Sequence, residues 1–147
     1  MFRSIVVGTD GSQTATEAVR QAVELAKPLG AKLELVSAYE PISESRLKAE
    51  RRDAPEDLAW TINPREDVDA TLEIAAQIAS DAGVEASRQA RQGDPADAIL
   101  DVAEEIGADL IVIGNKGMTG AKRFLLGSVP NKVSHHAPCS VLIIRTS

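Results

Sequence analysis

The sequence predicts a doubly wound α/β fold built on a five-stranded parallel sheet. Short apolar runs, typical of strands buried on both faces, alternate along the chain with segments whose apolar residues recur at helical spacing. Glycine or a helix-capping residue stands at most of the boundaries between them. Regular alternation of this kind indicates βαβ units, with helices on both faces of the sheet. We expect a single domain over residues 1–147.

Most of the expected strands are apolar runs, at residues 5–7, 33–36, 110–113 and 141–144, and the run at 110–113 is the strongest. The remaining strand, at 84–91, is polar and only weakly indicated. Ligands of parallel α/β sheets bind outside the carboxyl ends of the strands, where the strand order reverses. The loops that follow residues 5–7 and 110–113 are therefore the natural candidates for a site.

Helices are expected between these strands, each recognised by an apolar stripe and by its ends. Ser12 suits the N-cap of the first helix, and in the third helix Asp94 suits the N-cap and Pro95 the first helical position. The glycines that suit helix C-termini are Gly30, Gly83 and Gly107. The last helix is expected around residues 128–136.

The connection over residues 40–64 is unusually long, because connections in compact domains are typically about 4 to 6 residues. It is rich in charged residues and in proline. We expect it to form a lid or a partly ordered, variable insertion, with a short helix in part of it.

Composition and charge argue against several classes of protein. The formal net charge of −6 disfavours a broad surface for nucleic acid or anionic membranes, which requires clustered basic residues. No apolar run approaches the roughly 18 residues of a membrane span, and no secretory signal pattern is visible. Cys139 is the only cysteine, so an intrachain disulfide is excluded. We expect a cytoplasmic protein without nucleic-acid or membrane partners.

The glycine-rich segment 114–128 has the features of an anion site. Its first glycines, which free the backbone to turn and to approach a ligand, are Gly114, Gly117 and Gly120. Gly127 and Ser128 lie where the last helix is expected to begin, so unpaired N–H groups and the positive end of the helix dipole are available there. The alternative is that the glycines only shape a tight strand-to-helix connection. The sequence contains neither a Walker motif nor a dinucleotide-binding glycine pattern after the first strand.

The spacing Gly114-x2-Gly117-x9-Gly127-Ser128 resembles the signature of ATP-binding universal stress proteins of the UspA-like type. Residues 5–12 resemble the first strand and turn of that family, and the likeness extends over nearly the whole chain, including the long connection after the second strand. The resemblance implies an adenine nucleotide α-hydrolase-like fold with sheet order 3-2-1-4-5 and a nucleotide held between two loops.

The resemblance also implies which residues hold the nucleotide. Gly8, Thr9 and Asp10 would approach the adenosine, and the backbone of Ala38 would meet the adenine edge. Asp10 would lie near the ribose or a nucleotide-bound Mg²⁺, although it also suits a capping role for the following helix. The implied residues of the second loop and the last helix are Gly114, Asn115, Lys116, Gly117, Met118, Thr119, Gly120, Gly127, Ser128, Val129 and Pro130.

We therefore expect a stress-response regulator that binds ATP and not a fast enzyme, because neither a general base nor a transition-state arginine is evident. Cyclic AMP is the alternative ligand, since Lys116 stands where many relatives carry Arg or His and some relatives of this kind favour cyclic AMP. A nucleotide-independent dimeric interaction module is the other alternative. The resemblance suggests a homodimer formed through residues 141–145, an apolar edge strand that pairing would cover.

Overall fold

The computed structural model describes residues 1–39, 64–115 and 126–146. Its sheet has five parallel strands in the order β3-β2-β1-β4-β5, which confirms the predicted fold and strand order. The strands are β1 (Ser4–Gly8), β2 (Lys32–Tyr39), β3 (Ala86–Gln92), β4 (Leu110–Gly114) and β5 (Ser140–Ile144). The predictions for residues 40–63 lie outside the described residues.

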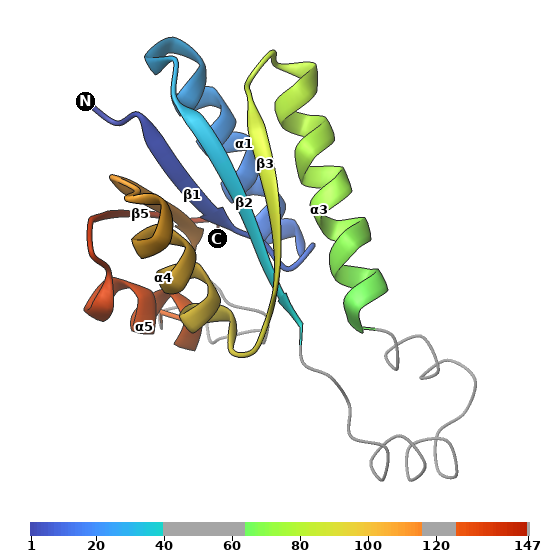
Figure 1. Cartoon of the computed structure of the whole chain (residues 1–147), viewed down its shortest axis with the longest axis vertical. Helices are drawn as coiled ribbons and strands as arrows, with labels where there is room; N and C mark the ends of the chain where they lie inside the picture. The colour runs from blue at the N-terminus through green and yellow to red at the C-terminus, as the bar shows by residue number, and fades with distance from the viewer. Residues whose placement is uncertain (40–63, 116–125, 147) are drawn as a thin grey trace, which may run out of the picture.

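Figure 1 shows that helices cover both faces of the sheet, α1 and α3 on one side and α4 and α5 on the other. The helices are α1 (Gln13–Leu29), α3 (Pro64–Asp81), α4 (Pro95–Ile106) and α5 (Ser128–His136). None of these described helices is long and apolar enough to cross a membrane.

The central strands are apolar on both faces because each face is covered by helices. Side chains of successive strand residues point to opposite faces of the sheet. Ile5 and Val7 accordingly belong to the core beneath α1 and α3, whereas Val6 belongs to the core beneath α4 and α5. All three side chains are fully buried. This double burial explains why β1 and β4 are continuous apolar runs in the sequence.

The ends of α1 and α4 are fixed by the residues that the sequence indicates. The Ser12 hydroxyl accepts a hydrogen bond from the N–H of Ala15 at 3.2 Å, and the Asp94 carboxylate accepts one from the N–H of Asp97 at 3.1 Å. Gly30 and Gly107 end these helices in the left-handed conformation, with φ of 63° and 64°. These caps start α1 and α4 close to the carboxyl ends of the strands.

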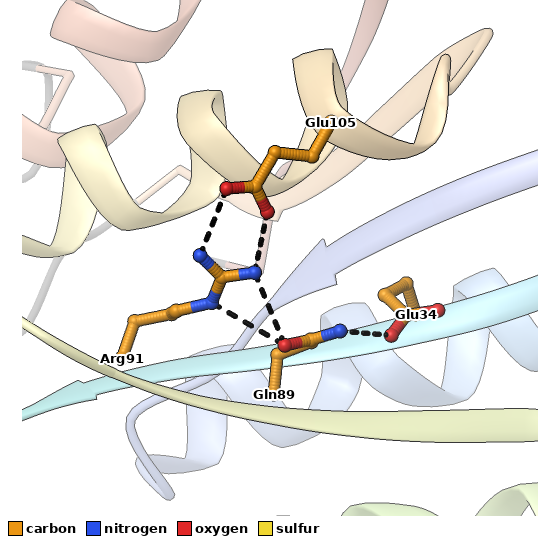
Figure 2. Close-up of polar contacts among 4 residues, drawn as sticks. All are labelled: Glu34, Gln89, Arg91 and Glu105. Carbon is orange, nitrogen blue, oxygen red and sulfur yellow. Dashed lines mark hydrogen bonds and ion pairs between the residues drawn. The ribbon is translucent and has the colours of Figure 1, made fainter.

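Strand β3 is polar because it lies at an edge of the sheet, where hydrogen bonds satisfy its side chains. The Gln89 side-chain amide donates to the Glu34 carboxylate on β2 at 2.9 Å (Figure 2). Arg91 donates to the side-chain oxygen of Gln89 at 3.3 Å and to the Glu105 carboxylate on α4 at 3.2 Å. The hydrogen bond from Arg91 lowers the pKa of the Glu105 carboxyl below its ordinary value. The network joins the edge strand to the C-terminal part of α4.

Asp109 ties the start of β4 to the start of β1, at the edge of the sheet where the strands begin. Burial, the largest single influence, raises the pKa of its carboxyl, but the backbone N–H groups of Arg3, Ser4 and Asp109 itself, together with the charge of the N-terminus, lower it. The net effect is a pKa below the ordinary value. These hydrogen bonds therefore stabilise the fold more strongly when the carboxyl is ionised than when it is protonated.

We predict that Asp109→Asn lowers the free energy of unfolding by about 1 kcal/mol at pH 7. Because the folded pKa is depressed, this contribution is complete above about pH 4 and is lost as the pH falls through the folded pKa. Urea unfolding of both proteins between pH 3 and pH 7 measures it, with Glu24→Gln on the exposed face of α1 as the control. A difference that stays constant over this range would contradict the assignment.

Candidate functional site

A cleft opens at the carboxyl ends of the strands, where the chain order reverses between β1 and β4. The predicted site residues that line it are Gly8, Thr9, Asp10, Ala38, Gly114 and Val129. The lining residues that sequence reasoning did not assign to the site are Ala15, Val36, Ser37, Pro95, Ile99 and Ile113. The structure thus brings together residues from β1, β2, β4 and three helices.

Two glycines allow helices to pack directly against the strand ends. A Cβ atom at Gly8 would overlap the Cδ1 atom of Ile99 on α4. A Cβ atom at Gly114 would lie 2.8 Å from the Cγ2 atom of Thr14 and 3.3 Å from its carbonyl oxygen, in the first turn of α1. In each case the nearest contact is shorter than 3.0 Å, so a larger residue at either position would require Ile99 or Thr14 to shift. The cleft walls are consequently set close to the strand ends.

The turn after β1 is held by its own polar groups. The N–H of Thr9 donates to the carbonyl of Val36 at 2.9 Å, and the Thr9 hydroxyl accepts from the N–H of Gly11 at 3.2 Å. Asp10 Oδ1 accepts from the N–H of Ser12 at 2.9 Å. Half-buried Asp10 therefore organises the turn before α1, while its side chain also borders the cleft.

The described parts of the chain contain no group of three or more His, Cys, Asp and Glu side chains placed to hold a metal ion. Among the described residues that line the cleft, Asp10 is the one that carries a carboxylate.

The N-terminus of α5 is available to an anion. Gly127 is the N-cap residue and brings no side-chain hydrogen bond, and the first turn contains no acidic residue. The backbone N–H groups of Ser128 and Val129 thus stand at the positive end of the helix dipole, and Val129 lines the cleft. The N-terminus of α4 differs, because the Asp94 carboxylate caps it and accepts the N–H of Asp97. Of these two helix ends beside the cleft, α5 is the one suited to a phosphate.

The remaining predicted site residues have different positions. Asn115 follows β4 and hydrogen-bonds to the chain after β5, with its side-chain oxygen accepting from the N–H of Thr146 at 3.2 Å. Gly127 and Ser128 form the start of α5, as expected, whereas Pro130 is fully buried and does not line the cleft. The predictions for the intervening loop, which lie outside the described residues, concern Lys116, Gly117, Met118, Thr119 and Gly120.

The missed lining residues carried a signal in the sequence, but an ambiguous one. Ile99 belongs to the apolar stripe of α4, and Ile113 ends the apolar run of β4. Their apolar side chains are equally consistent with a place in the hydrophobic core, and only the folded structure shows that they line the cleft.

A parallel sheet in this order, with a cleft at its switch point and an uncapped helix end beside it, defines a small α/β domain of the kind that holds ligands beyond the strand ends. The sequence model described as the universal stress protein family matches residues 1–145. The chain belongs to the universal stress protein family.

Similar proteins include the universal stress protein Rv1636 of Mycobacterium tuberculosis, 36% identical over 147 residues, which cover 99% of this chain and 98% of that protein. A crystal structure of a universal stress protein in complex with cAMP is 33% identical, with a TM-score of 0.73, over 99% of this chain and 98% of its own. A universal stress protein from Archaeoglobus fulgidus in complex with dAMP is 27% identical, with a TM-score of 0.69, over 97% of this chain and 98% of its own.

We predict that Gly114→Ala lowers the free energy of unfolding by about 1 to 3 kcal/mol, because the added methyl group meets Thr14. Thr14→Ser removes the Cγ2 atom that is nearest, so the double variant should recover part of the loss. Urea unfolding of the four proteins measures the coupling. Full stability of Gly114→Ala, or a double variant with simply additive losses, would contradict the proposed close packing.

Proposed function

We propose that this chain binds an adenine nucleotide, with ATP as the first candidate. We propose that the nucleotide-bound protein regulates the stress response in the cytoplasm. The observation that carries the proposal is the uncapped N-terminus of α5 beside a largely apolar cleft. A nucleotide combines an apolar, flat base with an anionic phosphate group, and the cleft offers a complementary surface for each.

The distribution of side chains favours one orientation of the nucleotide. Ala38, Pro95 and Ile99 provide apolar surface at the β2 and α4 side, which suits the base. Gly114 and Val129 place backbone at the α5 side, which suits phosphate. Asp10 borders the cleft at the end of β1, where its carboxylate is available to a ribose hydroxyl or to Mg²⁺ carried by the nucleotide.

ATP is proposed because the spacing of Gly114, Gly117, Gly127 and Ser128 matches the ATP-binding signature of the family. Cyclic AMP is the second candidate, favoured by the similarity to a universal stress protein in complex with cAMP. We expect hydrolysis to be slow at most. The described lining residues include no cationic side chain, and Asp10 already accepts the N–H of Ser12.

Val129→Asp tests the phosphate end of the site. A carboxylate in the first turn of α5 favours the helix but repels a phosphate, so binding should weaken without loss of folding. We predict that the dissociation constant for ATP, or for cyclic AMP, rises roughly tenfold more in Val129→Asp than in the neutral control Val129→Asn. Calorimetric titration measures both.

Equal affinities of the two Val129 variants would contradict placement of the phosphate at α5. If the folded, nucleotide-free wild-type protein bound neither ATP nor cyclic AMP, the nucleotide-independent interaction module would be favoured instead.

We further propose that the chain forms a homodimer through residues 141–145. Strand β5 lies at the edge of the sheet, and no described strand pairs with its outer side, which is therefore a candidate for pairing with a second copy. Its Leu142 is 40% exposed and does not belong to either apolar core. Antiparallel pairing of two such edges about a twofold axis would cover this side chain.

Leu142→Lys should convert the dimer to a monomer at micromolar concentration, because it places a charge at the paired edge. Ile106→Lys is the matched control, since Ile106 lies on α4 and not on the edge strand, and is similarly exposed at 38%. Sedimentation velocity measures the mass of each variant. A monomeric wild-type protein, or a dimer that survives in Leu142→Lys, would contradict this interface.

A further inference from the structure

The main chain of Asn115 connects the last strand to the start of α5. Its N–H donates to the carbonyl of Ile144 at 2.9 Å, at the end of β5. Its carbonyl accepts from the N–H of Gly127 at 3.1 Å, at the N-cap of α5. Asn115, which directly follows β4, therefore links the N-terminus of α5 to the end of β5 through hydrogen bonds of its main chain.

The side chain of Asn115 fixes the same residue from another direction. Its Oδ1 atom accepts both from the N–H and from the hydroxyl of Thr146, each at 3.2 Å. The Thr146 Oγ1 atom also lies 3.4 Å from the hydroxyl oxygen of Thr14 in the first turn of α1. Since a hydroxyl has one proton, Thr146 donates to Asn115 and can accept from Thr14.

These hydrogen bonds join three segments that are far apart in sequence. Thr14, Asn115 and Thr146 are all half-buried, and their hydrogen bonds are shielded in part from water. Gly114, next to Asn115, packs against Thr14 as well. Hydrogen bonds with β5 and Thr146 thus fix Asn115, and the bond between Asn115 and Gly127 fixes the start of α5.

We propose that Thr146 is a positioning residue for the ligand site, acting through Asn115 on the N-terminus of α5. This inference rests on the proposed function, because the N–H groups of Ser128 and Val129 are the proposed phosphate contacts. Thr146 does not touch the cleft. Its hydroxyl holds the Asn115 carboxamide, and the Asn115 carbonyl holds Gly127. Loosening the first bond releases the helix end that meets the phosphate.

Two substitutions at one position separate the hydroxyl from the rest of the side chain. Thr146→Val keeps the shape and the backbone N–H but removes the hydroxyl, whereas Thr146→Ser keeps the hydroxyl. We expect the dissociation constant for ATP, and for cyclic AMP if that is the ligand, to rise about fivefold to tenfold in Thr146→Val. We expect it to stay within about twofold of wild type in Thr146→Ser.

Amide hydrogen exchange of the nucleotide-free protein tests the same connection without a ligand. The N–H of Gly127 should exchange about tenfold faster in Thr146→Val than in wild type and at the wild-type rate in Thr146→Ser. Ser140→Ala removes a hydroxyl from the opposite end of β5 and serves as the control, with both affinity and exchange unchanged.

The two readouts distinguish failure of this inference from failure of the proposed function. A wild-type protein that binds ATP or cyclic AMP, with unchanged affinity and unchanged Gly127 exchange in Thr146→Val, would overturn the role of Thr146 and leave the nucleotide site intact. A wild-type protein that binds neither nucleotide would remove the proposed function. Faster Gly127 exchange in Thr146→Val alone would then still establish the connection to α5, and unchanged exchange would overturn it.

Discussion

The close approach of helices to the strand ends, permitted by glycine at positions 8 and 114, is the constraint on which the site depends. Without side chains at these positions, α4 meets β1 through Ile99 and α1 meets β4 through Thr14. The cleft walls are then built from well-packed helices and strands, and the loops are left to complete them. The same packing brings Thr14 within reach of Thr146, so the hydrogen bonds around Asn115 depend on it too.

The helix ends of α4 and α5 beside the cleft differ in chemistry, and this difference gives the site its polarity. The Asp94 carboxylate caps the N-terminus of α4 and disfavours an anion there, whereas Gly127 leaves that of α5 without a side-chain cap. In a chain with a net charge of −6, such a local arrangement of backbone N–H groups can attract an anion without a basic surface. The chain belongs to the universal stress protein family. The difference between the ends of α4 and α5 supports the proposal that a nucleotide binds with its phosphate toward α5.

Local patterns made most of the fold predictable, and long-range contacts account for what was not. Apolar runs and caps predicted the central strands and the starts of α1 and α4, because these features depend on neighbouring residues. Strand β3 was only weakly indicated, since Gln89 is satisfied by Glu34, which lies far away in the sequence. At the site, the resemblance to the family predicted that Gly8, Thr9, Asp10 and Gly114 lie at the ligand-binding cleft. The contribution of Thr146 could not be predicted, because only the folded chain brings it to Asn115.

Mapping of ligand contacts by amide chemical shifts is the most direct test that an adenine nucleotide binds in this cleft. ATP, and in parallel cyclic AMP, would be titrated into ¹⁵N-labelled protein. If the nucleotide binds as proposed, saturable shifts are expected at Gly8 and Ala38 on the base side, and the largest shifts at Ser128 and Val129, where the phosphate would meet α5. Saturable shifts confined to other surfaces, or no shifts with either nucleotide in a folded, nucleotide-free protein, would contradict the proposal.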